Sequence, residues 1–151
     1  MHAIGMKYRP FPEPINQTTQ SAVNAHPSAA SARAADFDLG AATARVLTDS
    51  PWRVALLASS GWSHAFLTEK NHFLWPDTPA DAALYEALRA GDYAAWRETP
   101  AASVEDSGQQ EILNWMCLTG ALAELGRTPE WTDFIDTWIF NSSKAFLIAP
   151  P

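Results

Sequence analysis

One short apolar run constrains the fold of this chain more than any other stretch. Residues Arg53–Ala58 (RVALLA) form an almost continuous apolar segment, bounded by Pro51 and Gly61. A short continuous run between such turn residues is typical of a buried β-strand. We therefore expect a buried strand over these residues.

The rest of the pattern predicts helices on both sides of this strand and two more strands after it. Capping boxes at Thr78–Asp81 and Ser107–Gln110 mark two helix starts, with Thr78 and Ser107 as the capping residues. The expected helices cover residues 36–48, 79–91 and 108–125, and the expected strands cover residues 134–140 and 144–149. This order indicates the α/β class, as part of a three-layer αβα domain with a short mixed sheet and an open sheet edge.

The first 35 residues differ in composition from the remainder. They are rich in Pro, Ala, Ser, Asn and Thr, and they show no sustained period. We expect residues 1–35 to be a disordered leader and residues 36–151 to be the folded part. The chain carries a net charge of −7, and the leader holds three basic residues and one acidic residue. The folded part is therefore acidic enough to repel phosphate backbones, which argues against nucleic acid as a partner.

The chain has one cysteine and no apolar run of membrane length. Cys117 lies in a helical pattern and has no second cysteine to pair with, as is usual in a reducing compartment. We expect it to be a small packed residue. No segment approaches the roughly 18 apolar residues of a membrane span, and the first residues lack an apolar core of signal-peptide length. We therefore expect a cytoplasmic protein without a membrane partner.

The segment Ser59–Phe73 (SSGWSHAFLTEKNHF) follows the predicted strand and could hold several kinds of site. One is a serine hydrolase nucleophile, because Gly61–Ala65 (GWSHA) nearly matches the G-x-S-x-G elbow. The match fails at Ala65, where the tight turn needs glycine. It also fails because no histidine follows Phe73 to act as the general base. We therefore set the hydrolase aside.

The same segment offers two further interpretations. His64, Glu69 and His72 could bind a metal, but carboxylate metal sites of this kind need two Glu-x-x-His motifs and the chain has one. We expect Glu69 and His72 to be solvated surface residues. Alternatively, His64 is an acid/base residue at the end of the predicted strand, where ligand crevices form in open sheets. Taken alone, a single histidine there is more often a structural residue than an acid/base group.

Glu111 is a second residue in an unusual position. In the expected helix 108–125 it shares a side with Trp115, Leu118 and Leu122. An unpartnered carboxylate on an apolar face is costly, while the helix N-terminus favours the ionised form that a metal ligand requires. The spacing equally allows Glu111 to reach water at the start of the helix. Both interpretations stay open at this point.

Three separated segments carry a resemblance to a known family. They are SSGWSHAFLTEK (59–70), EDSGQQEILNW (105–115) and FNSSKAFLIAPP (140–151). In this order they resemble the class III extradiol ring-cleavage dioxygenases, in particular the catalytic beta subunit of protocatechuate 4,5-dioxygenase-like enzymes. The resemblance covers roughly residues 37–151.

The resemblance implies an oxidoreductase of aromatic catabolism. Enzymes of this family open catecholic aromatic acids such as protocatechuate or gallate with Fe(II) and O2, and hold the iron by two histidines and one glutamate. By matching motif, Glu111 would be the carboxylate ligand of the iron. His64 would be a second-sphere acid/base group, and no role is assigned to residues 141–143. A small partner subunit is common in the family.

The chain also departs from the family pattern. The two iron-ligating histidines of the family come from an N-terminal half, whereas the histidines before His64 here are His2 and His26, and neither matches. The chain therefore resembles the C-terminal portion of such an enzyme, with the missing N-terminal half as an expected partner. We expect weak or absent Fe(II) binding and no ring cleavage by the isolated chain. The alternative is a non-catalytic family remnant or assembly module.

Overall fold

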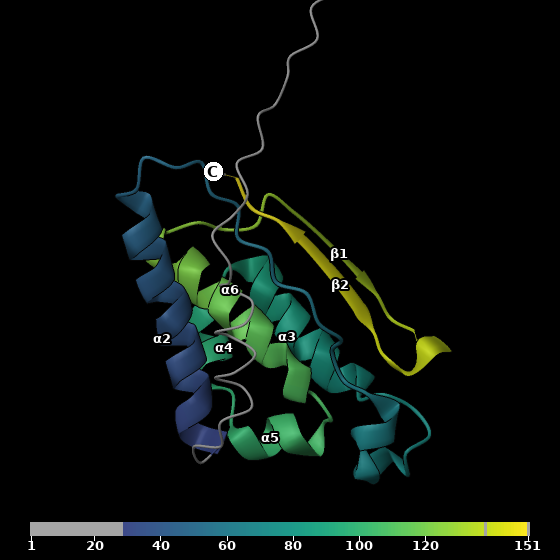
Figure 1. The fold of residues 1–151 in the computed structure, drawn as a ribbon. Coiled ribbons are helices and arrows are strands. Elements are labelled where there is room, and N and C mark those ends of the chain that lie inside the picture. Colours follow the sequence, from purple (N-terminus) through teal and green to yellow (C-terminus); the bar gives the residue numbers. More distant parts are fainter. Residues whose placement is uncertain (1–28, 138, 151) are drawn as a thin grey trace, which may run out of the picture.

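The computed structural model describes residues 29–137 and 139–150. Helices dominate this part of the chain, and the two strands form one antiparallel sheet (Figure 1). The longer elements are α2 (Ala29–Thr48), α3 (Thr78–Ala90), α4 (Tyr93–Glu98), α5 (Ala101–Asp106), α6 (Leu113–Glu124), β1 (Trp131–Ile135) and β2 (Lys144–Ile148). Short 3-10 turns are η1 (Ala65–Leu67), η2 (Glu69–Asn71), η3 (Gln110–Ile112) and η4 (Ile139–Asn141).

Helix α6 lies at the centre of the helical part and packs lengthwise against α2 (Figure 1). The close approach depends on two glycines. A Cβ atom added at Gly40 would lie 1.8 Å from the carbonyl oxygen of Cys117, and one added at Gly120 would lie 2.0 Å from that of Phe37. Any larger residue would therefore force the two helix backbones apart.

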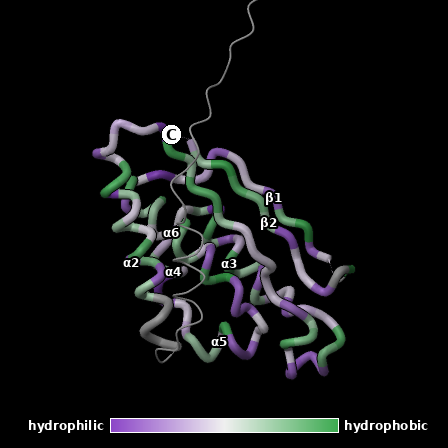
Figure 2. The backbone as a smooth tube through the Cα atoms, viewed as in Figure 1, coloured by the Kyte–Doolittle hydropathy of each residue, from purple (hydrophilic) through white to green (hydrophobic). Residues whose placement is uncertain are grey.

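A tryptophan joins the helical part to the hairpin. Trp62 is buried, with ring centroids 5.8 Å from Trp96, 5.5 Å from Trp115 and 5.9 Å from Phe134 of β1. Phe134 also stacks on Tyr85 of α3, at 4.9 Å between centroids. Aromatic pairs at such separations add to the stabilisation from area burial. Hydrophobic residues accordingly extend from the helices onto both strands (Figure 2).

The predicted strand Arg53–Ala58 is wrong. These residues form no strand, and they make no backbone–backbone hydrogen bond with any residue that the structure describes. From Ala55 to Ser60 exposed and partly buried residues alternate, as they do in extended backbone. These residues are therefore extended as in a strand, but no strand of the described chain forms backbone hydrogen bonds with them.

Two of the predicted helix starts also need correction. Helix α3 is capped by Asp77, whose carboxylate accepts a hydrogen bond from the backbone N–H of Ala80, and not by Thr78. Its predicted end is confirmed, because Gly91 adopts a left-handed φ of 70°. Ser107 ends α5 instead of starting a helix, and α6 begins at Leu113.

The sheet is smaller and simpler than expected. The predicted strand 134–140 is wrong over most of its length, because β1 runs from Trp131 to Ile135 and residues 139–141 form the turn η4. Strand β2 nearly matches its prediction. The strands pair antiparallel with Phe134 opposite Ala145, so the expected mixed sheet is not formed by the described residues. The coarse expectation of mixed helices and strands is confirmed.

The described part begins at α2, which starts at Ala29 and not near Asp36. Most of the predicted leader, residues 1–28, lies outside the described residues. None of the helices in the described ranges combines the length and apolarity that crossing a membrane requires.

Candidate functional site

The two residues singled out in the sequence lie together. Nε2 of His64 is 3.3 Å from Oε2 of Glu111, although the geometry is not that of a hydrogen bond. The His64 side chain is 14% exposed and the Glu111 side chain 56% exposed. The pair therefore lies at the rim of the protein, with the imidazole covered and the carboxylate accessible to water.

Neither residue sits on the element expected for it. His64 precedes η1 in an extended conformation, after a segment that forms no strand. Glu111 lies in η3, one short turn before α6, and not on the apolar face of a long helix. Its exposure agrees with the interpretation in which the carboxylate reaches water at the helix start.

Backbone contacts fix the two turns against each other. The N–H of His64 donates to the carbonyl of Gly108 at 3.0 Å, and the buried Thr68 hydroxyl donates to the carbonyl of His64 at 2.7 Å. Gly108 has a φ of 65°, and a Cβ atom there would lie 2.8 Å from both the His64 carbonyl oxygen and the Thr68 hydroxyl. Only glycine suits both this conformation and this spacing.

Gly61 lies directly beside the pair. Its N–H donates to Oε2 of Glu111 at 3.1 Å, which aims the carboxylate toward His64. The imidazole ring also lies beside Phe66, with 5.0 Å between ring centroids. The pair is thus surrounded by the N–H of Gly61, by the space left where Gly61 has no side chain, and by the ring of Phe66.

A buried carboxylate holds the segment beneath the pair. Asp81 of α3 is fully buried, and it accepts hydrogen bonds from the Ser63 N–H at 3.0 Å, the Ser63 hydroxyl at 2.6 Å and the Gln109 side chain at 2.7 Å. Burial raises the pKa of the Asp81 carboxyl above its ordinary value, although the hydrogen bonds from Ser63 and Gln109 oppose this shift. Ser63 itself is buried and bound in this network, so its hydroxyl is not placed as a nucleophile.

The segment 141–143, to which the sequence assigned no role, contributes Ser142. The buried Ser142 hydroxyl accepts a hydrogen bond from the N–H of Trp62 at 3.2 Å. A Cβ atom at Gly61 would lie 3.3 Å from the same hydroxyl oxygen. Ser142 therefore braces the backbone that leads into His64. A serine in a short turn gives no local signal of such a long-range contact.

Glu69 and His72 are exposed, as expected of surface residues. Among the described residues, no group of three or more His, Cys, Asp or Glu side chains is arranged to hold a metal ion. His2 and His26 lie outside the described ranges.

The donor set at this site differs from the one that the Fe(II) implied by the resemblance requires. A facial triad needs two imidazoles and one carboxylate, whereas this site brings together one imidazole and one carboxylate. The buried Nε2 of His64 has no hydrogen-bond partner among the described residues, so it could face a further group at the site. On their own, His64 and Glu111 do not fit the triad.

Comparison with known proteins identified no relative. No family model matches the chain, and neither a curated protein nor a solved structure matches it.

Proposed function

We propose that this chain is the C-terminal portion of a class III extradiol dioxygenase acting on catecholic aromatic acids such as protocatechuate or gallate. In this proposal the described helices and hairpin are part of a three-layer αβα domain, and the rest of the domain comes from residues outside the described part. The observation that supports it best is the Glu111–His64 pair. The resemblance assigned the two residues complementary roles from separate motifs, and their side chains lie 3.3 Å apart.

The two side chains divide the work in this proposal. Bound Fe(II) would hold the catechol and activate O2. Glu111 supplies the carboxylate ligand, since its exposed side chain can reach a metal at the rim. His64 accepts or returns a proton at Nε2, because this atom lies 3.3 Å from Oε2 of Glu111 and has no hydrogen-bond partner among the described residues. The two iron-ligating histidines come from another polypeptide or from a further segment of a longer protein.

Ring cleavage tests the proposal directly. The isolated chain, incubated with Fe(II), O2 and protocatechuate or gallate, should give no yellow ring-opened product. The same chain mixed with a polypeptide from the adjacent reading frame that supplies two histidine ligands should give the product. Glu111→Gln and His64→Phe should each abolish activity of the mixture, whereas Glu105→Gln on an exposed part of α5 should leave it unchanged. Activity of the mixture that survives Glu111→Gln would reject the assignment.

The second candidate is a non-catalytic assembly module. The incomplete donor set favours it, since Glu111 as a single carboxylate ligand holds a metal less tightly than the three ligands of a facial triad. If no adjacent reading frame supplies the histidines, and mixtures with family subunits stay inactive, this candidate replaces the first.

A further inference from the structure

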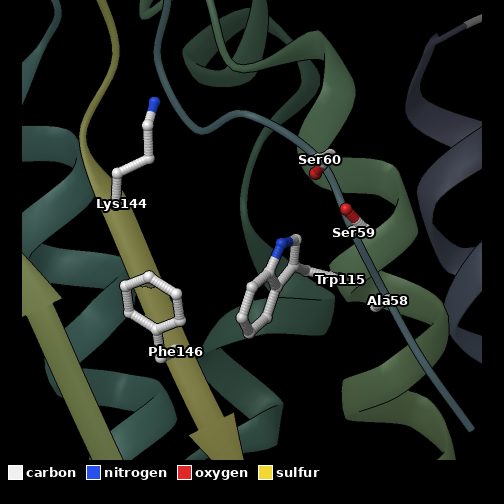
Figure 3. A pocket seen from close by; sticks show the side chains of 7 residues that line it. Ala58, Ser59, Ser60, Trp115, Lys144 and Phe146 are labelled. Atoms are coloured by element: carbon white, nitrogen blue, oxygen red, sulfur yellow. The ribbon is translucent and has the colours of Figure 1, made fainter.

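A groove separates the segment Arg53–Ser60 from strand β2. Its cavity has a volume of about 260 Å³ and is lined by Ala58, Ser59, Ser60, Trp115, Lys144, Ala145 and Phe146. In Figure 3 the Ser59 and Ser60 side chains lie on one side and Lys144 and Phe146 on the other, with the Trp115 ring between them. The groove is thus bordered on both sides by polypeptide backbone.

Neither bordering backbone has a neighbour across the groove. The segment 53–60 makes no backbone–backbone hydrogen bond with any described residue, and β2 pairs with β1 along its other edge. In Figure 1 this segment, which leads away from α2, runs beside β2 in the opposite direction. The two backbones therefore lack backbone partners across the groove, although the carbonyl of Ser59 accepts a hydrogen bond from the Asn114 side chain. Strand edges without backbone partners are templates for a further strand.

The side chains of the segment point to the same conclusion. Leu56 and Ala58 pack on the hydrophobic core, but Leu57 is 86% exposed and Val54 is 42% exposed. A run that is apolar on both faces is typical of a strand in the interior of a sheet. Exposed Phe146 of β2 adds apolar surface beside the groove. This surface suits an occupant with apolar side chains.

Two buried hydrogen-bonding groups lie at the groove without partners. The indole Nε1 of Trp115 and the hydroxyl of Ser60 are buried and form no hydrogen bond with any described residue. Trp115 as a whole is 5% exposed. An unsatisfied buried donor costs about 1–3 kcal/mol, and a carbonyl oxygen would remove this cost. A molecule bound in the groove would therefore need hydrogen-bond acceptors where it meets Trp115 and Ser60. It would need both donors and acceptors where it meets the two backbone edges.

We propose that this groove is a strand-acceptor site, which binds an extended segment of a second polypeptide between residues 53–60 and β2. The guest backbone pairs with both edges, one parallel and one antiparallel, because the two edges run in opposite directions. Its carbonyl groups accept from Trp115 and Ser60, and its apolar side chains on alternate positions cover the surface around Leu57 and Phe146. Main-chain pairing supplies the affinity, as in other cases of strand addition.

A second copy of this chain is a poorer occupant. Strand β2 already has β1 on one edge, so it cannot lie between two other strands. The segment 53–60 is anchored to its own core by Leu56 and Ala58, and Asn114 binds the carbonyl of Ser59. Neither β2 nor the segment 53–60 can therefore serve as the inserted strand in the groove of another copy.

Peptide binding with hydrogen exchange tests the site. The probes are fluorescein-labelled heptapeptides that alternate Thr with Val, Ile or Phe, and the matched controls carry Pro at the central position, which removes one N–H donor. At saturation, at least one probe should slow amide exchange tenfold or more in both 53–60 and 144–148. The proline peptides should not. Protection of one segment alone, or of neither by any probe, would overturn the proposal.

A conservative variant tests the role of the groove floor. Trp115→Phe keeps an aromatic ring and removes the N–H, so peptide affinity measured by fluorescence anisotropy should fall about fivefold. The smaller ring should also lower thermal stability, so affinity is measured at a temperature where circular dichroism shows the variant to be folded. Trp131→Phe on the half-exposed outer strand is the control and should leave affinity unchanged. If the Trp115→Phe variant binds the peptide as tightly as the wild type, the indole N–H does not contact the peptide and this part of the proposal is wrong.

Three other results would each assign the groove to a different occupant and overturn the proposal. Protection in the unliganded chain that disappears on deletion of residues 1–28 would assign it to the chain's own N-terminal segment. Concentration-dependent protection with dimer formation would assign it to a second copy. Protection by protocatechuate alone would assign it to a small molecule. The ring-cleavage assay is a separate experiment, so failure of the strand-acceptor site leaves the Glu111–His64 assignment standing.

Discussion

Gly61 lies against the imidazole of His64, with no space for a side chain between them. A Cβ atom at position 61 would be 2.5 Å from both Cε1 and Nε2 of the ring. The N–H of the same glycine binds the carboxylate of Glu111. One residue without a side chain therefore sets the positions of both members of the candidate site.

Gly61→Ala should displace the His64 ring and destabilise the protein by about 1–3 kcal/mol, the usual cost of overpacking a well-filled site. Urea unfolding measures this cost. In a His64→Ala background the same substitution should cost less than half as much, because the clashing ring is absent. An equal cost in both backgrounds would show that the His64 ring is not what excludes a side chain at position 61.

Asp81→Ala should destabilise the fold by about 2–5 kcal/mol, because the buried donors of Ser63 and Gln109 lose their acceptor. Chemical denaturation gives the value. Asp49→Ala, which removes an exposed carboxylate from the end of α2, is the control and should stay within about 0.5 kcal/mol of the wild type. Similar losses in the two variants would argue against a special role of the buried network.

Gly40→Ala should separate α2 from α6 and lower the free energy of unfolding by more than about 2 kcal/mol, since the new methyl group would meet the backbone of Cys117. Circular dichroism melting curves report the loss. Val46→Ala removes side-chain volume from a 72% exposed position on the same helix and should have little effect. A Gly40→Ala variant as stable as the wild type would contradict the close helix contact.

Asp36 should make stability depend on pH. Burial raises the pKa of its carboxyl to about 6 from an ordinary value of 3.8. Between these values the folded chain holds a proton that the unfolded chain releases, so stability present below the lower value is lost as pH rises through about 6. Asp36→Asn cannot ionise and should remove the part of the decline that this carboxyl causes, with a gain of up to about 3 kcal/mol at pH 7.5. The buried Asp81 carboxyl, whose pKa is also raised, keeps its own part.

The measurement is urea unfolding of both proteins at intervals from pH 4 to pH 8. Asp38→Asn, on the exposed side of the same helix, is the control and should keep the wild-type decline. Parallel curves for the wild type and Asp36→Asn would show that this carboxyl does not cause the decline.

Local signals in the sequence predicted the elements whose boundaries depend on a few adjacent residues. Helix α3 ends at Gly91 as expected, because a left-handed glycine stops a helix whatever lies around it. Strand β2 was also close to its prediction, because β1 precedes it closely in the chain and pairs with it. The strand predicted over residues 53–58 was wrong, since a β-strand needs a hydrogen-bonded partner strand and the described chain provides none for this segment. The capping box at Ser107 failed because Ser107 ends α5 in a helical conformation and Gly108 follows it with a left-handed φ of 65°.

Some residues of the candidate site could also be predicted from local sequence, and others could not. The segments 59–70 and 105–115 pointed to His64 and Glu111, and the structure brings these two side chains together. Asp81 was taken only as part of a capping box, since no local pattern distinguishes an exposed cap from a buried acceptor of three hydrogen bonds. Ser142 was missed because its contact with Trp62 joins residues that are distant in the chain.

The glycine contact between α2 and α6 has a mechanical consequence. Because backbone touches backbone at Gly40 and Gly120, the two helices resist shear as one stiff unit, without flexible side chains between them. Tension applied at the start of α2 would be transmitted to α6, and so to the turn that carries Glu111.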